Sequence, residues 1–171
     1  MEKLWSPWRS HYIESFKSKN EDDKSCIFCA AVDADVVSDD NLKVFEGKKV
    51  FIILNLYPYN NGHLMVVPKR HVADYIELTS EELAEVNDLI KLTITAQRKI
   101  MKPHGFNIGA NLGKAAGAGI DEHIHFHVLP RWNGDTNFMP ALGEVKVISQ
   151  DLKRSKNELV KMFNLLLDKN I

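Results

Sequence analysis

The amino-acid sequence predicts an α+β fold with a mainly antiparallel sheet of five or more strands, one long central helix and a C-terminal helix. Three observations support this prediction. Segments with strand character come in clusters, a single helical stretch of roughly twenty residues separates the clusters, and glycine, proline and asparagine divide the strands at short intervals. Clustered strands separated by one long helix are typical of α+β domains with antiparallel sheets.

Three strands are predicted before the long helix. The first two, residues 42–46 and 49–55, flank a glycine turn. The second contains the apolar run FIIL, which is typical of a strand buried on both faces. The stretch YPYNNG at 57–62 combines residues that favour turns. A third strand is expected over 63–67, ending at the proline that follows.

The central helix is predicted to begin at the capping-box sequence TSEE, residues 79–82. Apolar residues recur behind it at helical spacing until Pro103 and Gly105 end the helix. Over 106–112, apolar residues alternate with Asn and Gly, as in a half-buried strand. After a loop with three glycines, another strand is expected over 123–129, where apolar residues alternate with three histidines.

The chain is expected to form one domain over 1–171, because its 171 residues are a usual length for a single domain. The motifs are expected in a core over 26–137, which follows an N-terminal arm and loop over 1–25. One more strand is expected near 144–148. The C-terminal helix is expected over 149–170, where apolar residues again recur at helical spacing.

The composition excludes several classes of protein. The 22 basic and 23 acidic residues give a net charge of -1, without the positive excess that polynucleotide or membrane-surface binders need. No apolar stretch approaches the length of a transmembrane helix, and no signal peptide is evident. Two cysteines are too few for a disulfide scaffold. We therefore expect a cytoplasmic protein without nucleic-acid or membrane partners.

The segment HIHFHVL contains the candidate catalytic residues His123, His125 and His127. A strand has a period of two, so all three imidazoles are expected on one face, about 6–7 Å apart along the strand. With an ordinary pKa near 6.5, imidazole acts as nucleophile, base or acid near neutral pH. A neutral ring can attack phosphorus, and a protonated neighbour can assist the leaving oxygen. The residues alone also allow two other interpretations, namely core histidines and a zinc site made by the three rings.

This segment resembles the His-φ-His-φ-His-φ-φ motif (φ, apolar) of the histidine triad (HIT) superfamily of nucleotide hydrolases and transferases, and all seven positions match. The resemblance extends upstream through NLYPYNNGHLMVVPKRH and NLGKAAGAG, and downstream through LPRWNGD. It covers roughly Cys26 to Asn137, about two thirds of the chain. The stretches LWSPWR and PRWNGDTNF resemble the bacterial branch related to dinucleoside polyphosphate phosphorylases and to the fragile-histidine-triad hydrolases.

The resemblance implies a role for each histidine of the triad. His125 would be the nucleophile that carries a nucleotidyl group. His127 would lie beside the bridging oxygen of the scissile phosphoanhydride. His123 would orient the array or bind metal. His63 stands where the family often has a histidine beneath the nucleophile, and Asn55 stands where relatives hold the ribose.

The phosphates are expected at the loop between the last two predicted strands. Asn111 and Gly113 match an Asn-x-Gly that borders the phosphates in the family. Gly113, Gly117 and Gly119 allow backbone N–H groups to approach a phosphate closely, although a tight turn would use the same residues. Many relatives have Gly-Gln-Ser/Thr shortly before the triad, but residues 118–122 are AGIDE here. Phosphate contacts would then come from backbone N–H groups or from Lys114. The residues leave open whether water or inorganic phosphate accepts the nucleotidyl group.

The sequence CIFC provides Cys26 and Cys29 at a spacing typical of one half of a tetrahedral zinc site. A redox pair lacks its usual βαβ setting, and two buried thiols are the other alternative. The resemblance suggests His71 and His123 as the remaining metal ligands. Four protein ligands would make this Zn²⁺ structural.

We therefore expect a nucleotide phosphoanhydride hydrolase or transferase that cleaves dinucleoside polyphosphates, such as diadenosine tetraphosphate, at the α-phosphorus through a nucleotidyl-histidine. The expected ligand is an adenine nucleotide or dinucleoside polyphosphate, with structural Zn²⁺ and no organic cofactor. A nucleoside phosphoramidate hydrolase, a non-catalytic nucleotide-binding regulatory protein and a zinc-dependent hydrolase are the alternatives. Family members commonly form homodimers, so a homodimer or larger homo-oligomer is expected.

Overall fold

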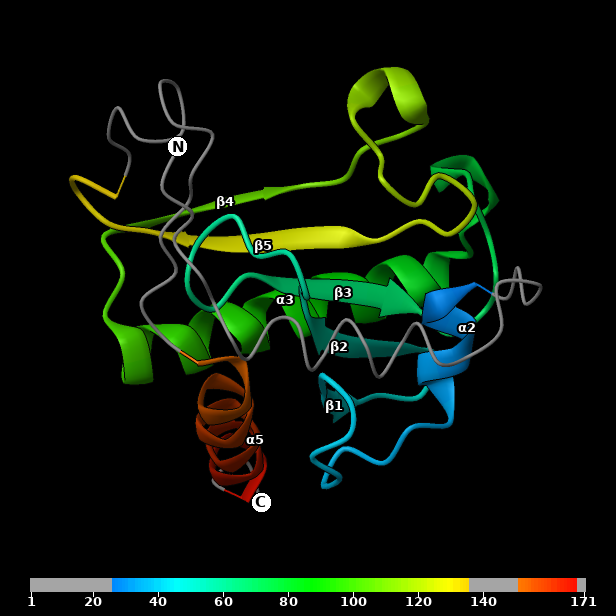
Figure 1. The fold of residues 1–171 in the computed structure, drawn as a ribbon. Helices are drawn as coiled ribbons and strands as arrows, with labels where there is room; N and C mark the ends of the chain where they lie inside the picture. Colours follow the sequence, from blue (N-terminus) through cyan, green and yellow to red (C-terminus); the bar gives the residue numbers. More distant parts are fainter. Residues whose placement is uncertain (1–25, 136–150, 169–171) are drawn as a thin grey trace, which may run out of the picture.

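A computed structural model of the chain describes residues 26–135 and 151–168. The predicted N-terminal arm, the predicted strand at 144–148 and residues 136–137 of the predicted core lie outside the described residues. The described part contains a five-stranded antiparallel sheet in the order β1-β2-β3-β5-β4 (Figure 1). Its strands are β1 Lys43–Glu46, β2 Val50–Leu54, β3 Leu64–Pro68, β4 Gly105–Gly109 and β5 Phe126–Arg131. The predicted α+β fold with an antiparallel sheet is confirmed.

Three α-helices surround the sheet in the described residues: α2 Ile27–Val32, α3 Ser80–Met101 and α5 Leu152–Asp168. A 3₁₀ turn, η1 Tyr75–Glu77, precedes α3, and a second, η2 Lys114–Ala116, lies between β4 and β5. In Figure 1, α3 runs behind the sheet and α5 stands at the β1 side, next to α3. The sequence analysis predicted α3 and α5 but missed α2, whose six residues are too few to show helical periodicity.

The sheet separates two apolar cores, because successive side chains of a strand point to opposite faces. The main core lies between the sheet and the helices α3 and α5, and contains Ile52, Val66 and Val128. The second core lies on the other face and consists of Phe28, Phe51, Met65 and Val67. Strand β2 contributes to both, which confirms the prediction that FIIL is buried on both faces.

The predicted capping box begins α3. The Thr79 hydroxyl accepts from the Glu82 N–H at 3.2 Å, and the Glu82 carboxylate accepts from the Thr79 N–H at 2.8 Å. Arg70 also donates to both carboxylate oxygens of Glu82, at 3.0 and 2.8 Å. The Arg70 guanidinium lowers the pKa of Glu82 to about 2 despite its burial. This cluster connects the residue before His71 to the first turn of α3.

Several predicted boundaries were wrong by a few residues. Strand β4 ends at Gly109 instead of residue 112, and β3 covers Leu64–Pro68 instead of 63–67. The C-terminal helix, predicted over 149–170, begins at Leu152, because the Asp151 carboxylate caps it by accepting the Arg154 N–H at 3.0 Å. Within the described residues, no helix is both long and apolar enough to span a membrane.

The most relevant difference concerns the histidine strand. Pairing in β5 begins only at Phe126, so His123 and His125 precede the paired strand. Instead, the Ile124 N–H donates to the Val72 carbonyl at 2.7 Å, and His123 Nε2 lies 2.8 Å from the Pro68 carbonyl oxygen. Residues 123–125 therefore hydrogen-bond to the end of β3 and to the residues after it, and their side chains still alternate between the two faces.

Candidate active site

The three triad histidines lie on the sheet face that carries the second core. Ile124, Phe126 and Val128 point the other way and belong to the main core, as the alternation predicted. His123 and His125 are buried, whereas His127 is half-buried. The rings of His125 and His127 are edge-to-face with their centroids 4.9 Å apart. The structure therefore places two adjacent imidazoles where one substrate group can contact both.

The backbone determines which nitrogen of His125 carries the proton. His125 Nδ1 lies 2.9 Å from the carbonyl oxygen of His123. A carbonyl oxygen only accepts hydrogen bonds, so Nδ1 is the protonated nitrogen and Nε2 keeps its lone pair. Burial lowers the pKa of His125, which favours the neutral ring. His125 thus presents an unprotonated Nε2, the form that a nucleophile requires.

A chain of hydrogen bonds gives His127 the opposite tautomer. The Tyr59 N–H donates to His63 Nδ1 at 3.1 Å, so the proton of the buried His63 ring lies on Nε2. His63 Nε2 lies 2.9 Å from His127 Nδ1 and donates to it. His127 Nε2 therefore carries the proton of the neutral ring. A protonated Nε2 is the group needed to donate to a leaving oxygen.

The structure places His63 against His127, with ring centroids 5.0 Å apart. The register explains the position. Leu64 pairs with Val128 and Met65 with His127, so His63 and His127 are diagonal neighbours on one face. The buried His63 therefore contacts the triad through His127.

Burial also changes the protonation of His127. It lowers the pKa of the ring to about 4, with a smaller contribution from the neighbouring His125. His127 is therefore neutral at pH 7 before substrate binds. Bound phosphates add negative charge beside the ring, which favours the protonated form and raises the pKa again.

Asn55 takes part in the same hydrogen-bond network. Its Oδ1 accepts from the Tyr57 N–H at 2.9 Å, which directs Nδ2 toward His63 Nδ1 at 3.3 Å. Asn55 thus has the turn geometry that was the alternative to a ribose contact, and it also supports the tautomer of His63.

The predicted phosphate loop leaves the sheet beside the triad, because Gly109 at the end of β4 pairs with His127. Gly113 and Gly117 have φ angles of 76° and 90°, which L side chains rarely adopt. Asn111 Nδ2 donates to the Gly117 carbonyl at 3.3 Å and holds the loop together. A Cβ added at Gly113 or Gly119 would meet no atom within 4 Å, so both positions border open space. Lys114 is exposed and faces Asp121 at 3.7 Å.

The four predicted metal ligands are brought together from distant parts of the chain. Their ligand atoms all lie within 4.8 Å of one another. Cys26 Sγ is 3.3 Å from His123 Nδ1, and Cys29 Sγ is 3.2 Å from His71 Nδ1. Ligands of a tetrahedral zinc lie about 3.3–3.8 Å apart, given the usual Zn–S and Zn–N lengths. His123 directs its Nε2–H at the Pro68 carbonyl, which leaves Nδ1 for a metal. The residues present therefore fit a closed zinc site.

Three residues near the site were not predicted. Phe28, fully buried on α2, packs against His123 and His125 with ring centroids 5.4 and 4.9 Å apart. Tyr59 covers His63 at 4.9 Å. Asp135 binds the 57–62 turn through Asn60, as described below. Phe28 lies within CIFC and Asp135 within PRWNGD, so these two motifs were the available signals.

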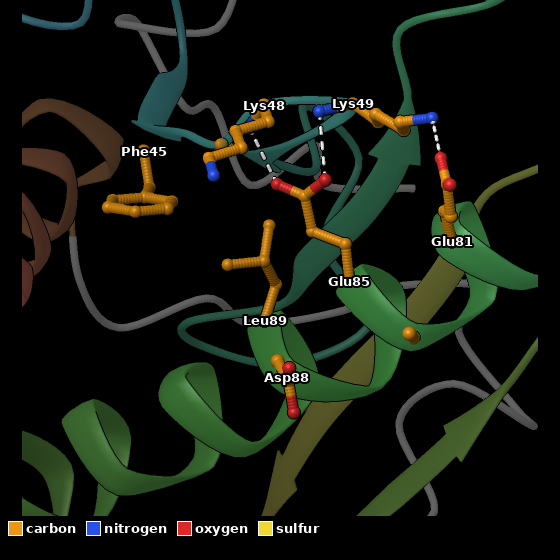
Figure 2. A pocket seen from close by; sticks show the side chains of 9 residues that line it. Phe45, Lys48, Lys49, Glu81, Glu85, Asp88 and Leu89 are labelled. Carbon is orange, nitrogen blue, oxygen red and sulfur yellow. Dashed lines mark hydrogen bonds and ion pairs between the residues drawn. The ribbon is translucent and has the colours of Figure 1, made fainter.

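A hollow of about 500 Å³ lies away from the histidines, between the β1–β2 turn and α3 (Figure 2). Several of its charged groups have partners. Figure 2 shows Glu85 accepting from the backbone N–H groups of Lys48 and Lys49, at 2.6 and 2.8 Å, and Lys49 paired with Glu81. A Cβ at Gly47 would overlap Glu85 Oε1. The arrangement fastens the turn to α3, and the triad remains the candidate active site.

Comparisons with known proteins agree with this geometry. The family model described as "HIT domain" matches residues 37–134, more than half of the chain. The chain belongs to the HIT family. Among curated proteins, this HIT chain is 41% identical over 161 residues to the AP-4-A phosphorylase of Mycobacterium tuberculosis, covering 93% of this chain and 83% of that protein. It is 34% identical over 135 residues to the adenosine 5'-monophosphoramidase hnt1 of Schizosaccharomyces pombe, covering 79% and 96% of the two chains.

A solved HIT structure is also similar. The Zn-bound histidine triad family protein from Mycobacterium smegmatis superposes with a TM-score of 0.68 at 31% sequence identity. The match covers 85% of this chain and 97% of that chain. The fold predicted from the triad motif and its flanking segments is thus the fold of the HIT family.

Proposed function

We propose that this HIT protein cleaves dinucleoside polyphosphates, such as diadenosine tetraphosphate, at the α-phosphorus through a covalent nucleotidyl-His125. The observation that carries this proposal is the pair of opposite tautomers at His125 and His127. One ring presents a lone pair and the other a proton, 4.9 Å apart between centroids. A nucleophile and an acid side by side are what the exchange of one phosphoanhydride bond requires.

In the first step His125 Nε2 attacks the α-phosphorus. A P–N bond forms, the bond from phosphorus to the bridging oxygen breaks, and that oxygen receives the hydrogen bond or proton of His127 Nε2. In the second step water or phosphate attacks the same phosphorus, and the P–N bond breaks. The proton that the attacking oxygen loses passes to His127 Nε2, which replaces the proton given to the leaving group. The neutral His125 is regenerated for the next turnover.

The nucleotide contacts are assigned to the residues that surround this pair. Asn55 is proposed to hold the ribose, and Asn111 with Gly113, Gly117 and Gly119 to border the phosphates through backbone N–H groups. His63 supports the site by fixing the proton of His127. Residues 118–122 provide no Gln or hydroxyl side chain. We therefore assign the side-chain contact with the phosphates to Lys114, which lies in the same loop. The 41% identity to a phosphorylase favours inorganic phosphate as the acceptor.

We also propose that Cys26, Cys29, His71 and His123 bind one structural Zn²⁺. The donor set and the distances of 3.2 and 3.3 Å between facing ligands support it. A zinc with four protein ligands supplies folding free energy and has no position for substrate. His123 then serves the triad through its backbone carbonyl, which holds the proton of His125.

Phosphoramidate hydrolysis is the second candidate. The 34% identity to a monophosphoramidase favours it, and the same two histidines would expel an amine in place of a phosphate oxygen. For the whole protein, we propose a single domain over 1–171, a cytoplasmic location and a homodimer. The edge strand β4, with Ile108 50% exposed, supports the homodimer.

Incubation of the protein with diadenosine tetraphosphate, with and without inorganic phosphate, tests the proposal. ADP plus ATP appearing only with phosphate indicates phosphorolysis, and AMP plus ATP without phosphate indicates hydrolysis. His125→Ala should lower either rate by at least about a thousandfold, since covalent catalysis is lost. Turnover of adenosine phosphoramidate alone would favour the second candidate. Binding of AMP without any product would support a regulatory protein and contradict both enzymatic proposals.

A further inference from the structure

Asp135, at the end of the PRWNGD segment, is a nearly buried carboxylate with several donors. The side chain is 8% exposed. Arg131 binds it through Nε at 2.7 Å and a terminal nitrogen at 2.8 Å, and the Trp132 N–H donates at 3.0 Å. A two-pronged arginine pair of this kind has a defined geometry as well as charge. The carboxylate is therefore held rigidly at the end of β5.

The same carboxylate reaches a different part of the chain. Asn60, in the turn between β2 and β3, donates from Nδ2 to Asp135 Oδ2 at 2.8 Å and to the Pro130 carbonyl at 3.3 Å. The Asn60 carbonyl accepts from the His63 N–H at 3.2 Å. Asp135 thus fixes the position of the turn that leads into His63.

This turn determines the proton on His127. Its Tyr59 N–H donates to His63 Nδ1, and His63 Nε2 donates to His127 Nδ1. If the turn shifts, His63 loses the shorter of the two contacts that keep its Nδ1 unprotonated, and only the Asn55 amide remains, at 3.3 Å. His63 can then adopt the other tautomer, and His127 Nε2 no longer carries the proton.

We propose that Asp135 is a positioning residue for leaving-group protonation: through Asn60 it holds the 57–62 turn, so that Tyr59 and His63 keep a proton on His127 Nε2. This inference rests on the proposed function, because it assumes that His125 forms a bond to phosphorus while the bond from phosphorus to the leaving oxygen breaks. Asp135 itself touches neither histidine in any described contact. The proposed effect passes through Asn60 and the turn.

The test compares esters of AMP whose leaving groups differ in basicity. A p-nitrophenyl ester releases a stable anion that needs no proton, whereas an alkyl or unsubstituted phenyl ester releases an oxygen that does. We expect Asp135→Asn and Asn60→Ala to lower kcat at least about tenfold for the basic leaving groups. For the p-nitrophenyl ester the loss should stay below about threefold, because that step needs no acid. Asn60→Ala leaves the Arg131–Asp135 pair intact, so it remains informative if Asp135→Asn fails to fold.

Two further variants make the test specific. His63→Ala should give the same dependence of kcat on the leaving group. Adding Asp135→Asn to His63→Ala should lower kcat no further, since both substitutions break the same chain of contacts. Glu85→Gln is the matched control. Figure 2 shows its carboxylate accepting from the backbone N–H groups of Lys48 and Lys49, in the β1–β2 turn. It should affect all esters alike.

Equal losses on every ester for Asp135→Asn and Asn60→Ala, or an additive double variant, would overturn the inference. The proposed function is judged separately, on the wild type. If wild-type protein releases no p-nitrophenol and forms no nucleotidyl-histidine, the proposed function fails before the role of Asp135 is considered.

Discussion

His125 and His127 are chemically different because their surroundings are different. Each neutral imidazole has one proton for two nitrogens, and the first hydrogen-bond partner decides where it goes. The His123 carbonyl accepts a hydrogen bond from His125 Nδ1–H, while His63 Nε2–H donates to Nδ1 of His127. Two identical side chains thus present different groups at Nε2, a lone pair on His125 and a proton on His127, which are the forms that the proposed nucleophile and acid need.

The buried His127 predicts a dependence of stability on pH. In the unfolded chain its pKa is about 6.5, and in the folded protein it is about 4. Above pH 6.5 both states are neutral and the full stability is present. As pH falls toward 4, only the unfolded state binds the proton, so the free energy of unfolding decreases by at most about 3 kcal/mol. Urea unfolding of wild type and His127→Gln between pH 7.5 and 4.5 measures the difference, and identical pH slopes would contradict it.

Lys156 provides a second prediction at this scale. Its ammonium group, 1% exposed, donates to the Ser38 carbonyl and to the carbonyl and Oδ1 of Asn41, the latter two at 2.8 and 3.2 Å. Burial lowers its pKa, against the pull of nearby Asp side chains. Lys156→Met leaves these acceptors unpaired and should cost about 2–4 kcal/mol of unfolding free energy. Denaturant unfolding measures the loss. Lys153→Met, at an exposed position of α5, is the control and should change stability by less than about 0.5 kcal/mol.

At the scale of elements, α2 depends on its contacts. A helix of six residues is not stable alone. Phe28 anchors it in the second core, and Cys26 and Cys29 bring it to His71 and His123. Through Phe28 and His123 the same helix packs against the nucleophile. The proposed zinc site would therefore position the triad as well as fasten α2 to the sheet.

The metal proposal predicts one zinc per chain in protein purified without chelator. Removing the zinc, or replacing Cys29 by Ser, should lower the Tm by at least about 5 °C and make α2 susceptible to proteolysis. Elemental analysis and thermal unfolding are the measurements. Ile27→Ser, at a position 57% exposed on the same helix, should change neither value. A stoichiometry near zero would contradict the proposal.

The elements were predictable where they have a clear period or cap. The TSEE box, the buried run of β2 and the alternation of the triad all led to correct elements. The ends of β4, β5 and α5 were not predictable, because they depend on partners such as Val72, Pro68 and Asp151. The candidate site likewise has features that the sequence could predict and features that it could not. Motifs indicated the histidines and the candidate metal ligands. The tautomer of His127 and the proposed role of Asp135 depend on contacts between residues 64 and 75 positions apart, His63 with His127 and Asn60 with Asp135.

At the scale of the whole molecule, the two faces of the sheet carry different groups. The main core with α3 and α5 covers one face, and the triad with the zinc ligands occupies the other. The edge strand β4 adjoins β5 on one side, and its other side has no strand in the described residues. An exposed antiparallel edge is a common site of self-association.

The proposed homodimer predicts a change of mass on one substitution. Ile108, 50% exposed on β4, would be buried when two such edges pair. Ile108→Lys should convert the dimer to a monomer in light scattering after gel filtration. Ile76→Lys, at a position 85% exposed on η1, should leave the dimer intact. A monomeric wild type, or a dimeric Ile108→Lys, would contradict the arrangement.

The central claim is that His125 Nε2 forms a bond to the α-phosphorus of the substrate. Rapid quenching with alkali or with denaturant at neutral to alkaline pH, where a P–N bond survives, during turnover of diadenosine tetraphosphate, followed by mass spectrometry of the peptide with residues 123–127 under the same conditions, measures it most directly. We predict one adenylyl group on His125, which disappears when substrate is exhausted and never forms in His125→Ala. Turnover without any adduct, or an adduct on another residue, would contradict the account.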